Sequence, residues 1–322
     1  MPKHILVAIK DPHGGRTLSL QRAQEWAVAH QARVTVFHSL YIPAIATANF
    51  YLPKQQQMDI AAAVEQAKRA LQQLAKPLIA AGVAIQVRVR WDHPVHESVV
   101  REVGREKIDL LMLDSYRHGA LARLVLSNTD WQVLRLCPCP VLLVKSRKPH
   151  ARSVMAVSVD PLHANDKPAA LDHLLIEQAK HLAAPFKAAV HVVHFYQPLL
   201  PLPMGMMIEP VVLPRDLFKQ HVKRVKLKFA ELTQAFKLGP RHTHLQVGTA
   251  SEDLPRVVQK LKATVLVMGA ISRSGLKRLF IGATAEQVID QVNCDVLIIK
   301  PAGFKTPVPA KASRPPVMLP PL

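Results

Sequence analysis

The sequence predicts an α/β protein built from two tandem copies of a doubly wound parallel sheet. Two observations carry this prediction. Short runs rich in Val, Ile and Leu alternate with helical patterns, and four segments of the first half recur in the same order in the second half. Strands that are buried on both faces have such continuous apolar runs, and regular β-α-β alternation is typical of parallel sheets with helices on both faces.

The repeat fixes the predicted domain boundaries. The recurring pairs are 5–12 with 154–161, 32–40 with 188–196, 109–115 with 264–270, and 131–145 with 286–300. We therefore predict one domain over 1–149 and a second over 150–304, which meet in the basic linker 145–153. The tail 305–322 is rich in proline and lacks periodicity, so we expect it to be disordered or polyproline-like.

The helices and strands of the first copy are predicted from the spacing of their apolar residues. Strand 5–10 leads into a helix over 16–30, whose apolar face includes Leu18 and Trp26, and strand 33–39 follows. A long apolar loop is expected over 41–53. The remaining predicted elements are a helix over 56–81, strand 83–90, a helix over 95–104, strand 108–114, a helix over 129–136 and strand 140–144.

The amino-acid composition limits the classes of protein to which the chain can belong. Hydrophobic residues make up 49% of the 322 residues and charged residues 20%, which is typical of a globular chain with a core. We see no secretory leader and no apolar stretch long enough to span a bilayer, and the three cysteines fit buried thiols in a reducing compartment. We therefore expect a cytoplasmic protein. The net charge of +19 suits an anionic partner but does not indicate which kind of partner this is.

A glycine-rich turn follows the strand expected over 263–268. The stretch "MGAISRSGLKRLFIGATAEQV" (268–288) contains three glycines, and Thr284 stands at a position suited to cap the helix that follows, with Gln287 as its partner. Glycines let backbone amides approach a phosphate, and a helix N-terminus attracts anions. Two interpretations stay open on the residues alone: a phosphate cradle, or loop glycines followed by a capped helix.

The turn, the Asp-Pro after the first strand, the strand-ending histidines and the duplication together resemble the universal stress protein family. The run "SNTDWQVLRLCPCPVLLVK" (127–145) is similar to its tandem, E-type members. The resemblance covers about 3–303. It implies adenine-nucleotide alpha hydrolase-like domains and a cytoplasmic, non-enzymatic stress-response factor, with slow nucleotide hydrolysis left open.

The resemblance also implies site residues. The family's phosphate motif, Gly-x2-Gly-x9-Gly-Ser/Thr, begins here at Gly269, and its second and fourth positions depart from the pattern. An ATP or AMP site in the second domain would use Asp160, Phe195, Gly269, Ser272, Arg273, Gly282, Ala283 and Thr284. The same register in the first domain gives Asp114, Arg117, Ser127 and Asn128. An acid at the first position repels phosphate, so we expect at most one nucleotide per chain.

Two apolar, proline-containing segments, 41–53 and 195–214, occupy equivalent places in the two halves. They suit packing between the domains, a cavity for an apolar or amphiphilic ligand, or a dimer contact, and the chain is expected to be a monomer or a homodimer. A basic amphipathic helix is expected over 215–237. This helix suits a solvated basic face, or contact with phosphates or anionic lipid head groups. A further interpretation of the whole protein is a scaffold for anionic partners.

Other chemistry is weakly indicated. His38 and His194 end equivalent strands, which favours a packing or hydrogen-bonding role. His242 and His244 alternate on one strand without a placed acidic or cysteine partner, so we predict no metal site. Aromatic residues are only 5% and form no stacking platform, so we expect no sequence-specific recognition of nucleic acid.

Overall fold

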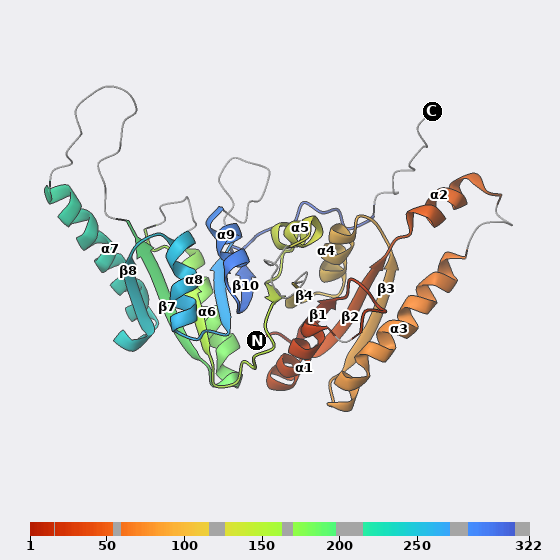
Figure 1. The fold of residues 1–322 in the computed structure, drawn as a ribbon, viewed down its shortest axis with the longest axis horizontal. Helices are drawn as coiled ribbons and strands as arrows, with labels where there is room; N and C mark the ends of the chain where they lie inside the picture. Colours follow the sequence, from red (N-terminus) through yellow and green to blue (C-terminus); the bar gives the residue numbers. More distant parts are fainter. Residues whose placement is uncertain are drawn as a thin grey trace, which may run out of the picture. The chain divides into compact units, whose positions relative to one another are not determined.

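The computed structural model describes residues 1–15, 17–53, 59–115, 126–162, 170–197, 215–270 and 283–312. The chain divides into two compact units (Figure 1), Met1–Arg147 and Lys148–Ala302, and the described residues 303–312 group with the first. Of the predicted tail, residues 305–312 form no helix or strand, and 313–322 lie outside the described residues.

The first unit is a parallel sheet in the order β3-β2-β1-β4-β5. Helices α1 and α3 pack on one face of this sheet, and α4 packs with α5. Its elements are β1 (His4–Ala8), α1 (Leu18–His30), β2 (Arg33–Leu40), α2 (Pro43–Tyr51), α3 (Ile60–Ala80), β3 (Ile85–Trp91), α4 (Val95–Arg105), β4 (Leu110–Asp114), α5 (Asn128–Leu136) and β5 (Val141–Val144).

The second unit repeats this topology, with the order β8-β7-β6-β9-β10 and parallel pairing throughout. The sequence prediction of two tandem doubly wound domains is therefore confirmed. Its elements are β6 (Val154–Ser158), α6 (Ala170–Ala183), η2 (Ala184–Phe186), β7 (Ala189–Tyr196), α7 (Arg215–Ala235), η3 (Pro240–His242), β8 (Thr243–Val247), α8 (Ala250–Lys260), β9 (Val265–Gly269), α9 (Ala283–Gln291) and β10 (Asp295–Ile299).

Each sheet has its own core. The central strands β1 and β4 of the first unit are buried along their whole length, and Trp26 of α1 is fully buried against them. In the second unit β9 and β10 are almost entirely buried. Burial of both faces explains why these strands read as unbroken apolar runs in the sequence.

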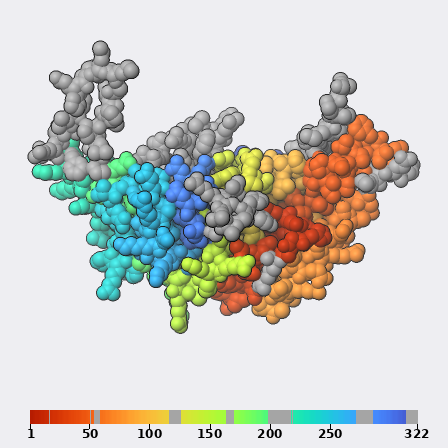
Figure 2. All heavy atoms as spheres, in the orientation of Figure 1, coloured from red at the N-terminus to blue at the C-terminus, as the bar shows by residue number. Residues whose placement is uncertain are grey.

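Two local predictions were wrong. Within the segment 41–53, which was expected to be a loop, Pro43–Tyr51 form helix α2. Pro43 lies in its first turn, where proline needs no amide. Figure 2 shows α2 in orange at the edge of the first unit, and none of its described side chains is fully buried. Thr284 is not the cap of α9, because that helix begins at Ala283. Thr284 therefore lies inside the first turn.

The three cysteines are buried and form no disulfide, and the sulfurs of Cys137 and Cys139 lie 3.5 Å apart. Within the described ranges, no helix is long and apolar enough to cross a membrane.

Candidate functional site

The predicted nucleotide residues of the second unit gather at the carboxyl ends of its strands. Asp160 follows β6, Phe195 lies near the end of β7, Gly269 ends β9, and Ala283 and Thr284 begin α9. In doubly wound sheets, ligands bind at this edge. The other predicted residues, Ser272, Arg273 and Gly282, lie outside the described residues.

The backbone at Asp160 is held by helix α6. The Asp160 amide donates to both carboxylate oxygens of Asp172, at 3.2 and 3.1 Å. Asp172 is buried in the first turn of α6. This carboxylate therefore fixes the turn after β6, and the Asp160 side chain stays half-buried at the sheet edge.

Phe195 is buried, and its backbone pairs with Gln246 of β8. The ladder with β6 ends two residues earlier, where the Val159 amide donates to the Val193 carbonyl at 3.0 Å. Between these points, the Nδ1 of His194 donates to the Val159 carbonyl at 3.0 Å. This bond ties the ends of β6 and β7 together.

His38 makes the equivalent bond in the first unit, because its Nδ1 donates to the Ile9 carbonyl at 2.8 Å. Burial lowers the pKa of His38, so the ring is neutral at neutral pH. The predicted strand-end role of both histidines is confirmed.

Gly269 is explained by packing. A Cβ at this position would lie 2.8 Å from Cδ2 of Leu171 and 3.5 Å from Cδ1 of Leu175. Both leucines belong to α6 and are buried. The absence of a side chain at Gly269 therefore lets α6 approach the sheet closely, whether or not a phosphate binds nearby.

The corresponding edge of the first unit is filled by the chain's own charges. Ser127 caps α5, and Asp130 completes a capping box by accepting from the Ser127 amide at 3.0 Å. The same carboxylate oxygen of Asp130 lies 2.7 Å from the Nζ of Lys10. An internal carboxylate thus occupies the N-terminus of α5, the position where a helix attracts an anion.

Asp114 also has an internal role. Its carboxylate accepts from the Ser19 amide at 2.8 Å and from the Ser19 hydroxyl at 2.6 Å. Asp114 is buried and ends β4. Asp114 therefore accepts hydrogen bonds from the first turn of α1. The equivalent residue of the second unit is Gly269, which lets α6 pack closely.

The second unit has no equivalent of the Asp130 carboxylate, which occupies the N-terminus of α5. The residue equivalent to Asp130 in the repeat is Ala285, which is buried in the first turn of α9. The residue equivalent to Lys10 is Val159. The second unit therefore has neither an acid equivalent to Asp130 nor a cation equivalent to Lys10, and the acid in the first turn of α9 is Glu286, one residue further on.

A small cavity lies at the same edge of the first unit. It has a volume of about 230 Å³, and the Lys10–Asp130 ion pair forms part of its wall. Most of its lining is apolar, with contributions from Ala8, Ile9, Phe37, Val95, Val99, Leu113 and Val133. This cavity belongs to the first unit alone.

Sequence reasoning missed the ion pair, the Asp114–Ser19 bonds and Asp172. One signal was visible: Ser127 followed three residues later by Asp130 is a capping-box pattern. The other contacts join residues far apart in the chain. Among the described residues, no group of three or more His, Cys, Asp or Glu side chains is arranged to hold a metal ion.

Comparison with known proteins places this geometry in a family. The model of the universal stress protein family matches residues 1–145 and 165–300. Universal stress protein E of Photorhabdus laumondii is 29% identical over 310 residues, covering 95% of this chain and 97% of the relative. Universal stress protein E of Escherichia coli K12 is 29% identical over 317 residues, covering 96% and 97%. A functionally unknown protein, PA1789 from Pseudomonas aeruginosa PAO1, superposes with a TM-score of 0.71 at 25% identity, covering 93% of each chain.

Proposed function

The chain belongs to the universal stress protein family, and from this premise we propose that it binds one adenine nucleotide, ATP or AMP, in its second domain. It acts as a cytoplasmic stress-response factor by binding rather than by catalysis. The first domain keeps the fold without the site.

The contrast between the two helix N-termini carries this proposal. At α5 the carboxylate of Asp130 accepts from Ser127 and pairs with Lys10, so a phosphate would meet a negative charge at close range. At α9 the equivalent residue is Ala285, so no carboxylate stands at the capping-box position, although Glu286 follows it in the first turn. The second edge therefore suits a phosphate better than the first.

The proposed contacts follow the family motif. Backbone amides at Gly269, Gly282, Ala283 and Thr284 hold the phosphates, Ser272 occupies the second motif position, and Arg273 neutralises charge. Asp160 orients the nucleoside, and the backbone of Phe195 meets the base. The bond from His194 to Val159 supports this arrangement, because it holds the ends of β6 and β7 in register.

Thermal unfolding with ATP tests the proposal. Binding to the folded state raises the melting temperature as ligand exceeds its Kd. We expect ATP to stabilise the full chain and Gly282→Val to abolish the shift. The matched change in the first domain, Ser127→Val, should lower stability and leave the ATP-dependent shift intact. A shift that survives Gly282→Val would refute the site.

Phosphorus NMR separates binding from slow nucleotide hydrolysis. The carboxylates of Asp172 and Asp114 have internal partners, because Asp172 accepts from the Asp160 amide and Asp114 accepts from Ser19. Neither is placed to act as a general base. ATP incubated with the protein should therefore keep its γ-phosphate signal, and release of phosphate that Gly282→Val abolishes would show an enzyme instead.

A second candidate function rests on the apolar cavity of the first unit. At about 230 Å³ it is smaller than a site for a drug-sized ligand, and its lining suits a short acyl or aromatic group. Native mass spectrometry of the purified protein would reveal such a ligand directly. Val99→Trp, which fills the cavity, should remove an apolar ligand without affecting the ATP-dependent shift.

A further inference from the structure

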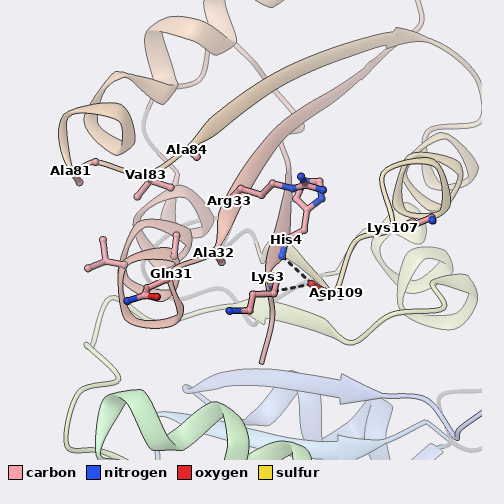
Figure 3. A pocket seen from close by; sticks show the side chains of 13 residues that line it. Lys3, His4, Gln31, Ala32, Arg33, Ala81, Val83, Ala84, Lys107 and Asp109 are labelled. Atoms are coloured by element: carbon pink, nitrogen blue, oxygen red, sulfur yellow. Dashed lines mark hydrogen bonds between the residues drawn. The ribbon is translucent and has the colours of Figure 1, made fainter.

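A larger hollow lies at the opposite end of the first sheet, at the amino ends of β1, β2 and β3 (Figure 3). Its volume is about 780 Å³. Its apolar wall comes from the end of α1 and from the turn that follows α3, and consists of Ala27, Val28, Ala32, Ala81, Val83 and Ala84. This volume falls within the range of small-molecule sites.

The backbone around the hollow is well fixed. The Arg33 amide donates to the Lys3 carbonyl at 3.0 Å, and the Val34 amide donates to the Ala84 carbonyl at 2.8 Å. Gln31 ends α1 in the left-handed region, with φ of 53°. These bonds hold the starts of the three strands together, so residues from distant parts of the sequence share one rim.

Three cations from three separate segments stand on this rim. Lys3 precedes β1, Arg33 begins β2, and Lys107 lies in the turn between α4 and β4. All three are exposed, and within the described part of the chain none of them forms an ion pair with a carboxylate. Their charges are therefore available to a ligand.

Asp109 is the one acid among the residues that line the hollow. Its Oδ2 accepts from the Lys3 amide at 2.8 Å and from the His4 amide at 2.9 Å, as Figure 3 shows. The carboxylate thus neutralises backbone dipoles at the start of β1. Three cations against one bonded acid leave the rim positive.

His4 adds no negative group to the rim. Its Nδ1 donates to the Glu106 carbonyl at 3.1 Å, and its Nε2 accepts from the Thr35 hydroxyl at 2.7 Å. Burial lowers the pKa of His4, and the nearby charge of Arg33 lowers it further. The neutral ring is locked in place by these two bonds and forms part of the wall.

We propose that this hollow binds a small organic phosphate monoester. A monoester is close to a dianion at neutral pH, which suits a rim that carries Lys3, Arg33 and Lys107. The guanidinium of Arg33 matches two phosphate oxygens at once, whereas each lysine acts as a point charge. The alanines and valines of the wall contact the organic part. Because these cations line a hollow, they fit a small molecule better than a nucleic-acid strand or a membrane.

Calorimetric titration of the full chain with phenyl phosphate tests this proposal. The phenyl ring serves as the apolar body of the probe. We expect Arg33→Gln to weaken binding about tenfold or more, because a hydrogen bond to a charged group is lost. Arg88→Gln is the matched control. Arg88 lies on the neighbouring strand β3, pairs with Glu106 at 3.5 Å and does not line the hollow, so its loss should change the Kd by less than about twofold.

The outcomes also separate this site from the proposed nucleotide site. Gly282→Val should leave phenyl phosphate binding unchanged. If Gly282→Val abolishes binding and Arg33→Gln does not, the probe occupies the nucleotide site and the inference is wrong. Equal losses in Arg33→Gln and Arg88→Gln would show a diffuse effect of positive charge, and the absence of heat in the unmodified protein would also overturn the proposal.

Discussion

A single carboxylate explains the different behaviour that we expect at the two sheet edges. Asp130 satisfies the Ser127 amide, completes a capping box and pairs with Lys10. Its counterpart Ala285 does none of this. The absence of a nucleotide site that we propose for the first domain therefore needs no change of fold, because a side chain from the chain itself can take the place of the ligand.

Replacing Asp130 tests this structural role. We expect Asp130→Ala to lower the free energy of unfolding by about 1–2 kcal/mol, since a helix cap is lost. Lys10 is partly exposed, so its charge can be hydrated once the acid is gone. Urea denaturation measures the change. Asp130→Asn keeps an acceptor for the Ser127 amide and should cost less; equal stability of Asp130→Ala and the unmodified protein would contradict the argument.

Three histidines of the second unit, in β7, η3 and β8, predict a pH dependence. The Nδ1 of His191 lies 2.9 Å from the Nε2 of His244, and the rings of His191 and His242 are 4.9 Å apart. Burial, followed by the charges of His244 and His242, lowers the pKa of His191 to about 4. The ring therefore stays neutral in the folded protein at pH values where the unfolded chain takes up a proton.

The sign of the effect follows from linkage. Between pH 6.5 and about 4 the unfolded state binds more protons at His191 than the folded state does, so stability falls as the pH falls through this window. His30, whose pKa burial also lowers to about 4, acts in the same direction. His191→Asn should flatten the slope of unfolding free energy against pH, and NMR titration should show the His191 ring neutral at pH 5. A ring that titrates near 6.5 would refute this.

At the scale of elements, the strands and most helices were predictable because their apolar residues recur in clear patterns along the sequence. The buried strands β1 and β4 read as apolar runs, and α8 shows a clear two-sided pattern. Helix α2 was missed because its apolar residues surround the whole helix, which removes the periodic signal. The start of α9 was misplaced by two residues, which is within the usual uncertainty of a helix end.

The functional elements were less predictable, for a physical reason. The rim of the basic hollow brings together Lys3, Arg33 and Lys107, which no local period connects. The bond from Asp160 to Asp172 likewise depends on how α6 docks against its sheet. In the sequence itself, only the motif around Gly269 indicated a functional site.

The contact between α6 and β9 gives a prediction about packing. Gly269→Ala would place a Cβ 2.8 Å from Leu171, so we expect a loss of about 1–3 kcal/mol through overpacking. Gly104→Ala is the control: a Cβ there meets nothing within 4 Å, and the change should stabilise helix α4 by about 0.5–1 kcal/mol.

A double-mutant cycle checks the mechanism. Leu171→Ala alone should cost about 2–5 kcal/mol by leaving a cavity. Combined with Gly269→Ala, the total should be smaller than the sum of the two losses, because the new methyl group fills part of that space. If the two losses in unfolding free energy are strictly additive in urea denaturation, contact with Leu171 is not the reason why residue 269 is a glycine.

At the scale of the whole molecule, the duplication gives two sheets of the same topology, to which we assign different functions. Each has the same strand order, yet one edge is closed by internal charges and the other is free of them at the equivalent position. If the proposed function holds, native mass spectrometry should show one ATP per chain. Two nucleotides would mean that the first domain binds in spite of Asp130.

The net charge of +19 gives a final prediction for the whole chain. Like charges repel one another in the compact state, so the folded protein is destabilised at low ionic strength. Added salt shortens the range of this repulsion to about 10 Å at 0.1 M, and we expect the free energy of unfolding to rise as NaCl is increased to about that level. Replacing the exposed Lys223 and Lys226 of α7 by glutamine reduces the net charge by two and should reduce the salt dependence measured in urea denaturation. A decrease of stability with added salt would mean instead that favourable ion pairs, such as Lys10–Asp130, outweigh the repulsion.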